Sequence, residues 1–154
     1  MKKLIFAVMA LVALCACTGE REYLEFRGLS LGMSAKAMCD SLQEQGFVLD
    51  SNLTDENAFV LNNAKDLSRV DIFQHNDTIS VVEESYAASY NDSTAAIYSR
   101  LHKEFTDTYG WSNMKHNSDL HREAEFQTGK GALVLILHNT YSPTLKVIYS
   151  VDDL

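Results

Sequence analysis

Two amphipathic segments, each ended by a glycine and an aromatic residue, constrain the fold more than any other feature of the chain. The first segment places apolar residues at the i, i+3, i+4 and i+7 spacing of one buried helical face: Ala35, Met38, Cys39 and Leu42. Ser34 precedes them and is suited to cap a helix by accepting a backbone N–H. Gly46 follows them and can adopt the left-handed conformation that ends a helix. We therefore predict a helix between Ser34 and Gly46, with Cys39 as a small buried core residue.

The second amphipathic segment is longer and carries more aromatic residues. Its predicted buried stripe has a spacing of four: Ile97, Leu101, Phe105 and Tyr109. Its predicted solvent side holds Arg100, His102, Lys103, Glu104 and Asp107. Asp92 or Ser93 should begin this helix, and Gly110 should end it.

Strand-forming runs follow each predicted helix. After the first helix they cover residues 47–49, 58–61, 70–75 and 78–90, with Asn76 and Asp77 as a tight turn between the last two. The alternation slips in the last run, which predicts a bulge or bend near residues 81–84. After the second helix we expect a loop over residues 111–120 and then strands over residues 122–128, 132–138 and 144–151.

This order of elements predicts an α+β, two-layer domain. Runs of adjacent strands favour a mainly antiparallel sheet, with two helices packed on one face and the order helix, strands, helix, strands. The pairs Gly46-Phe47 and Gly110-Trp111 close the two helices in the same way, which suggests an internal duplication.

The pattern of residues at the N-terminus is typical of an export signal. Lys2 and Lys3 precede an unbroken apolar run over residues 4–14 that ends in small residues. A membrane-spanning helix needs about 20 apolar residues, so this run is too short to be one. We divide the chain into a signal peptide (residues 1–16), a first mature residue with a short polar tether (residues 17–23) and one α+β domain (residues 24–154).

The residues Leu14-Cys15-Ala16-Cys17 resemble the lipobox of bacterial lipoproteins. The resemblance implies cleavage before Cys17, lipidation of its sulfur and acylation (palmitate) of its new amino group. Because one acyl chain anchors marginally and two or more anchor stably, a lipidated Cys17 would hold the domain at a membrane. The expected location is the bacterial cell envelope, with the outer membrane favoured, on its periplasmic or surface side. The alternative is ordinary signal cleavage near Cys17 and secretion of a soluble protein.

The charge of the mature chain argues against nucleic acid as a partner. The chain has 13 basic and 21 acidic residues, and removing Lys2 and Lys3 with the leader leaves 11 basic residues and a net charge of about −10. Such a domain repels phosphate backbones and anionic lipid heads. Membrane contact should therefore come from the lipid on Cys17.

A second resemblance concerns the mature domain. Gly32-Met33-Ser34, followed by Met38 and Leu42, resembles the opening of SmpA/OmlA-type lipoproteins. The tandem order of helix and sheet is similar to the fold of the β-lactamase inhibitory protein. These resemblances imply the same α+β fold and a role in assembly at the envelope.

The sequence carries none of the common catalytic spacings: no nucleophile elbow, P-loop, His-Glu-x-x-His or Cys-x-x-Cys pattern occurs. We therefore predict a non-enzymatic protein without a cofactor. The candidate metal ligands are His116, Asp119 and His121, since two imidazoles and a carboxylate in one loop could converge. A lipid-anchored hydrolase or metal enzyme of unrecognised type remains the alternative function.

Aromatic and acidic residues supply the candidate protein-binding site. Tyrosine and tryptophan contribute much of the contact energy in interfaces, although any of them could instead belong to the core. The candidates are Tyr86, Tyr90, Glu83, Glu84 and Trp111. We expect them to bind an envelope protein that offers arginine or lysine side chains.

Overall fold

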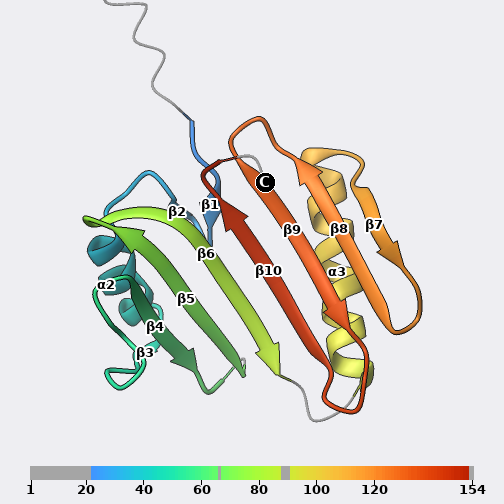
Figure 1. Cartoon of the computed structure of the whole chain (residues 1–154), viewed down its shortest axis with the longest axis horizontal. Helices are drawn as coiled ribbons and strands as arrows, with labels where there is room; N and C mark the ends of the chain where they lie inside the picture. Colours follow the sequence, from blue (N-terminus) through green and yellow to red (C-terminus); the bar gives the residue numbers. More distant parts are fainter. Residues whose placement is uncertain (1–21, 66, 88–90, 153–154) are drawn as a thin grey trace, which may run out of the picture.

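A single eight-stranded antiparallel sheet dominates the molecule (Figure 1). The structure is a computed structural model that describes residues 22–65, 67–87 and 91–152, with side chains in the second helix described from residue 94. The leader, Cys17 and Tyr90 lie outside the described residues. The strands run in the order β3-β4-β5-β6-β10-β9-β8-β7. Their bounds are β3 Val48–Leu49, β4 Ala58–Asn63, β5 Ser68–His75, β6 Thr78–Ala87, β7 Asn113–Asn117, β8 His121–Gln127, β9 Ala132–His138 and β10 Thr144–Ser150.

Two helices cover one face of this sheet, as Figure 1 shows. Helix α2 (Ala35–Glu44) packs against β3, β4 and β5, and helix α3 (Asn91–Tyr109) packs against β8, β9 and β10. Each helix is followed by four strands that pair in sequence order, and β6 pairs with β10 where the two halves meet. The predicted α+β class is confirmed. The two halves have the same layout, as an internal duplication would produce.

A small hairpin precedes α2 and corrects the predicted order of elements. Strands β1 (Glu25–Phe26) and β2 (Leu29–Ser30) form a separate two-stranded sheet. Arg27 and Gly28 have φ values of 51° and 77°, so this turn uses the left-handed region at both central positions. Phe26 is fully buried in the main core. The order is therefore strands, helix, strands, helix, strands.

Helix α2 follows the prediction closely. The Ser34 hydroxyl accepts a hydrogen bond from the Ala37 amide at 3.2 Å, so Ser34 is the N-cap. Gly46 has a φ of 96° and its amide donates to the Gln43 carbonyl, which ends the helix. All four residues of the predicted stripe are buried. Burial also raises the pKa of the Cys39 thiol, as expected of a core cysteine.

Helix α3 begins one or two residues before the predicted start at Asp92 or Ser93, and it buries a wider face than predicted. Gly110 ends it with a φ of 88°. His102 was expected on the solvent side, but its ring lies 5.8 Å from that of Tyr98 and 5.6 Å from that of Phe126. Tyr98 and His102 are four residues apart and therefore lie on the same helical face. Residues spaced by four drift around a helix that has about 3.6 residues per turn. The predicted stripe therefore did not include this part of the buried surface.

The predicted irregularity in β6 lies at Ser80, just before the expected range. Phe73 pairs with Val81 and Gln74 pairs with Ile79, which leaves Ser80 as the extra residue. The bulge places Ile79 and Val82 on the same face, and both are buried. This explains why the apolar residues of this strand break strict alternation.

The predicted loop over residues 111–120 is wrong in its middle, where strand β7 forms the edge of the sheet. Every residue of β7 is exposed. Its polar sequence therefore carries no alternation from which a strand could be predicted, and pairing with β8 holds it in place. Among the described residues, neither helix is long and apolar enough to cross a membrane.

Candidate functional site

The register of the sheet separates the candidate residues onto two faces. Glu84 pairs with Val70 and Val147, which belong to the core beneath the helices. Glu83 precedes it on the same strand and therefore points to the uncovered face. Tyr86 follows two residues after Glu84 and lies on the covered side. The two adjacent glutamates thus lie on opposite faces of the sheet.

On the covered face, Glu84 forms an internal ion pair. Its carboxylate lies 2.5 Å from the Arg27 guanidinium, and the Glu84 side chain is only 5% exposed. The Arg27 guanidinium also lies 5.1 Å from the centre of the Phe47 ring. Burial raises the pKa of Tyr86, and the negative charge of Glu84 raises it further. These contacts attach the β1–β2 hairpin to β6.

The uncovered face carries a charged groove across β4, β5, β6 and β10. The groove has a volume of about 690 Å³. Arg69 donates from Nε and Nη2 to Asp71, with a shortest distance of 2.6 Å, and Lys146 Nζ donates to Glu83 at 2.6 Å. Ser85 donates a further hydrogen bond to Glu83 at 3.2 Å. Each carboxylate in this groove is paired with a cation.

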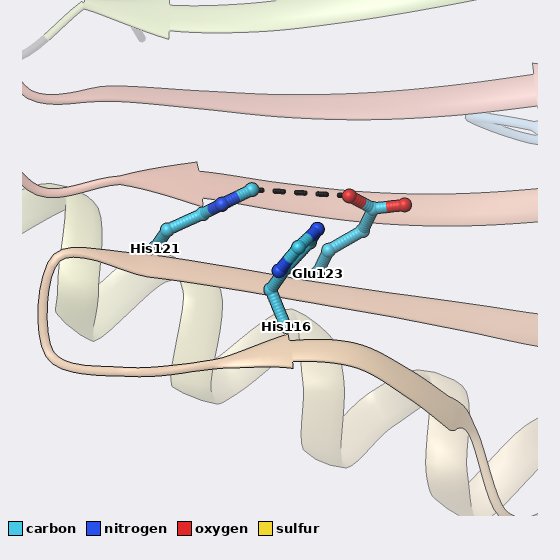
Figure 2. A group of neighbouring side chains, drawn as sticks. All are labelled: His116, His121 and Glu123. Carbon is cyan, nitrogen blue, oxygen red and sulfur yellow. Dashed lines mark ion pairs between the residues drawn. The ribbon is translucent and has the colours of Figure 1, made fainter.

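A cluster of three histidines and a glutamate lies on the other half of the same face. Figure 2 shows His116 on β7 beside His121 and Glu123 on β8. The ring centres of His116 and His121 are 4.3 Å apart, and those of His121 and His138 on β9 are 4.5 Å apart, with all three rings stacked. His121 Nε2 is 3.8 Å from the Glu123 carboxylate. The potential ligand atoms of His116, His121 and Glu123 all lie within 4.8 Å of one another.

A bulge in the edge strand places His116 in this cluster. Met114 pairs with Ala124, but His116 pairs with Glu123, so Lys115 is the extra residue. In regular register Lys115 would face Glu123 and His116 would face Arg122, which lies on the covered side. The bulge therefore turns His116 to the face that carries Glu123 and His121.

The electrostatics of the cluster favour neutral imidazole at its centre. Partial burial, followed by the neighbouring His116 and His138, lowers the pKa of His121, while the Glu123 carboxylate acts in the opposite direction. Neutral imidazole is the form that ligates metal ions.

The structure brings together two of the three candidate metal ligands predicted from the sequence. His116 and His121 are neighbours, whereas the Asp119 side chain is fully exposed and its carboxylate lies 3.7 Å from Arg122. Glu123 takes the position next to the imidazoles that was expected for Asp119. The signal for it was the spacing of His121 and Glu123, since residues two apart on a strand share a face. It was missed because the predicted strand began at residue 122.

The remaining candidates for protein binding lie apart from one another. Trp111 is 94% exposed in the connection between α3 and β7. Tyr90 lies outside the described residues. Of the described candidates, Glu83 is therefore the one whose side chain is on the uncovered face of the sheet, and it is paired with Lys146.

Comparison of the chain with family models, curated proteins and solved structures gives no match.

Proposed function

We propose that this protein is a lipid-anchored, non-catalytic binding protein of the bacterial cell envelope, and that it binds another protein through the uncovered face of its sheet. The observation that carries the proposal is the position of the helices. Both pack on the same face, so the other face of all eight strands is available for contact (Figure 1).

The composition of this face suits a protein partner. Paired charges line the groove, and Phe73, which alternates with the buried Ile72, is 41% exposed. A mixture of polar pairs and apolar surface is typical of interfaces between proteins that also exist separately. Since the mature chain is strongly acidic, the complementary partner surface is basic.

The anchor and the sheet act together in this proposal. The lipid on Cys17 confines the domain to the membrane surface, and the short tether over residues 17–23 keeps the sheet close to it. Two linked attachments raise the local concentration of the partner without any additional contact. The function is then to hold an envelope protein near the membrane.

The anchor is tested by changing Cys17 to Ala and following the protein in membrane and soluble fractions. The wild type should label with palmitate and sediment with membranes, and the variant should do neither. Equal labelling of the two proteins, or no labelling of either, would reject lipidation at Cys17.

The binding surface is tested by placing a photo-crosslinking residue at Lys146 on the uncovered face. Lys103, which is exposed on α3, provides the matched position on the other side of the domain. Crosslinking at Lys146 should give one adduct of defined mass in membranes, and crosslinking at Lys103 should not. With the photo-crosslinking residue at Phe73, which is exposed on the same face, the charge-reversed background E83K/K146E retains an ion pair and should lose the adduct that Phe73 gives in the wild-type background. An adduct that survives this exchange, or forms equally from Lys103, rejects the uncovered face as the site.

A further inference from the structure

We propose that His116, His121 and Glu123 form a binding site for a divalent transition-metal ion of the zinc type. The site lies on β7 and β8, at the opposite side of the uncovered face from the charged groove on β4, β5, β6 and β10. The inference does not depend on the proposed partner contact, because neither histidine nor Glu123 lines the groove at which that contact is tested.

The ligand set has the chemistry that zinc prefers. Two imidazole nitrogens and one carboxylate oxygen are the protein ligands of many zinc sites with one open position. Calcium and magnesium instead require several oxygen ligands, of which this cluster offers one carboxylate. The site should therefore discriminate between zinc and these harder cations.

The backbone around the site holds the ligands in place before any metal binds. The bulge at Lys115 fixes which face His116 occupies. In the β7–β8 turn, the Ser118 hydroxyl accepts from the His121 amide at 3.0 Å, and the Ser118 amide donates to the His121 carbonyl at 2.9 Å. The Asn139 amide donates to the Leu120 carbonyl at 2.8 Å, which ties the turn to the end of β9. The ligands thus lie on a hairpin whose turn is held by hydrogen bonds, and this reduces the conformational entropy lost when a metal binds.

The charges on β8 also distinguish Glu123 from its neighbour. Glu125 lies two residues further on the same face and forms an ion pair with Lys115 at 3.0 Å. Among the described residues, Glu123 forms no ion pair with lysine or arginine, and its carboxylate lies 3.8 Å from the His121 imidazole. Glu125 is therefore neutralised by lysine, and Glu123 is directed to the imidazoles, as a carboxylate that completes a metal site would be.

Small side-chain rotations convert the observed arrangement into a coordination sphere. Ligand atoms about 2.0–2.1 Å from a tetrahedral zinc ion are about 3.3 Å from each other. The observed separations of up to 4.8 Å are somewhat larger. His116 is exposed, so its ring can turn out of the stack without disturbing the core. Stacking against His138 restrains the ring of His121 from the other side.

The test is isothermal titration calorimetry of the full chain with Zn²⁺ and, separately, with Mg²⁺. The leader cysteines can bind zinc by themselves, so every protein carries Cys15→Ser and Cys17→Ser. Zinc should bind with one ion per chain, and magnesium should not bind. Replacing His116 or His121 by Ala, or Glu123 by Gln, should weaken zinc binding by at least about tenfold. Cobalt should give the visible absorption of a tetrahedral site, which the His116→Ala protein should lose.

The matched controls separate this site from other residues that could attract the metal. Asp119→Asn removes the exposed carboxylate of the turn, Glu125→Gln removes the glutamate paired with lysine, and His75→Ala removes an exposed histidine at the distant β5–β6 turn. Each should leave the zinc affinity unchanged within about twofold. Absence of saturable zinc binding overturns the proposal. Equal losses in Asp119→Asn and Glu123→Gln, or no loss in the three ligand variants, also overturn it.

Discussion

The two halves of this molecule share one layout but use different side chains to fill it. Helix α2 has 10 residues and covers its strands with aliphatic and sulfur-containing side chains, including Met38 and Leu42. Helix α3 has 19 residues, and the core between this helix and its strands contains a set of neighbouring aromatic rings. These rings are Tyr98, Phe105, Tyr109, Phe126 and Tyr149, together with His102.

The uncovered face shows a parallel difference. In the first half the carboxylates of Asp71 and Glu83 are paired with Arg69 and Lys146. In the second half, Glu125 is likewise paired with Lys115, but Glu123 faces imidazoles. The two halves therefore share a layout but differ in the chemistry of the uncovered face. The described carboxylates of the groove are all ion-paired, whereas the second half groups potential metal-ligand atoms together. The proposed metal site thus belongs to the second half.

The largest expected effect is loss of the aromatic core in the second half. Phe126 is fully buried and its ring lies 5.7 Å from Phe105 in an edge arrangement. Phe126→Ala should lower the free energy of unfolding by about 3–5 kcal/mol, measured by urea denaturation, because it removes a large buried side chain and leaves a cavity. Leu61→Ala provides the matched change on β4 in the first half and should cost about 2–4 kcal/mol.

A larger loss from Leu61→Ala than from Phe126→Ala would show that the first half, and not the aromatic one, dominates the stability of the domain.

The next effect concerns the β1–β2 hairpin, which precedes α2 in the first half and has no counterpart among the described residues before α3 in the second. Arg27→Met leaves the buried Glu84 carboxylate without its cation, which should cost about 3 kcal/mol of unfolding free energy. The double variant Arg27→Met with Glu84→Leu should recover most of this loss, because no uncompensated charge remains. If the double variant is less stable than Arg27→Met alone, the pair stabilises the fold beyond neutralising a buried charge.

The sequence predicted both helices, because their caps and apolar stripes are local. Ser34, Gly46 and Gly110 act where the sequence placed them. It also predicted the last three strands to within one residue at each end. These strands are buried on at least one face, so burial leaves a hydrophobic pattern that can be read without knowing the partner strand.

The candidate site could be predicted only in part, because it depends on register and on a polar edge strand. His138 lies opposite His121 through pairing of β8 with β9, which no local pattern encodes. Strand β7 has no buried residue, and its bulge at Lys115 decides the direction of His116. The bulge at Ser80 similarly decides that Glu84 points to the core. A shift of one residue exchanges the two faces, so these positions follow from pairing and not from composition.

A smaller effect tests the equivalence of the two helix ends. Gly46 and Gly110 both have positive φ values, and an added Cβ would meet nothing within 4 Å at either position. Ala at each position should therefore cost only the strain of the left-handed conformation, about 1–2 kcal/mol in thermal or urea unfolding. Gly131 is the contrasting position, since an added Cβ would meet the Ser150 carbonyl oxygen at a prohibitive distance. Costs for Gly46→Ala and Gly110→Ala that differ by more than about 1 kcal/mol would break the equivalence of the halves.

The smallest effect is a pH dependence that the second half alone should confer on the core through His102. Burial beside Tyr98 and Phe126 lowers the pKa of His102. In the unfolded chain a histidine titrates near 6.5, so on acidification the unfolded state takes up this proton before the folded state does. The contribution of His102 to stability is thus fully present above about pH 6.5 and decreases as the pH falls toward the lowered folded value.

His102→Gln removes this titration and keeps a polar group near Ser112 Oγ, which lies 3.1 Å from the His102 ring nitrogen. The unfolding free energy of the variant should therefore change less between about pH 7.5 and pH 5 than that of the wild type. His75→Gln, at the exposed β5–β6 turn, is the control and should follow the wild-type curve. Parallel curves for the wild type and His102→Gln would mean that the histidine in the α3 core does not make the second half more sensitive to acid than the first.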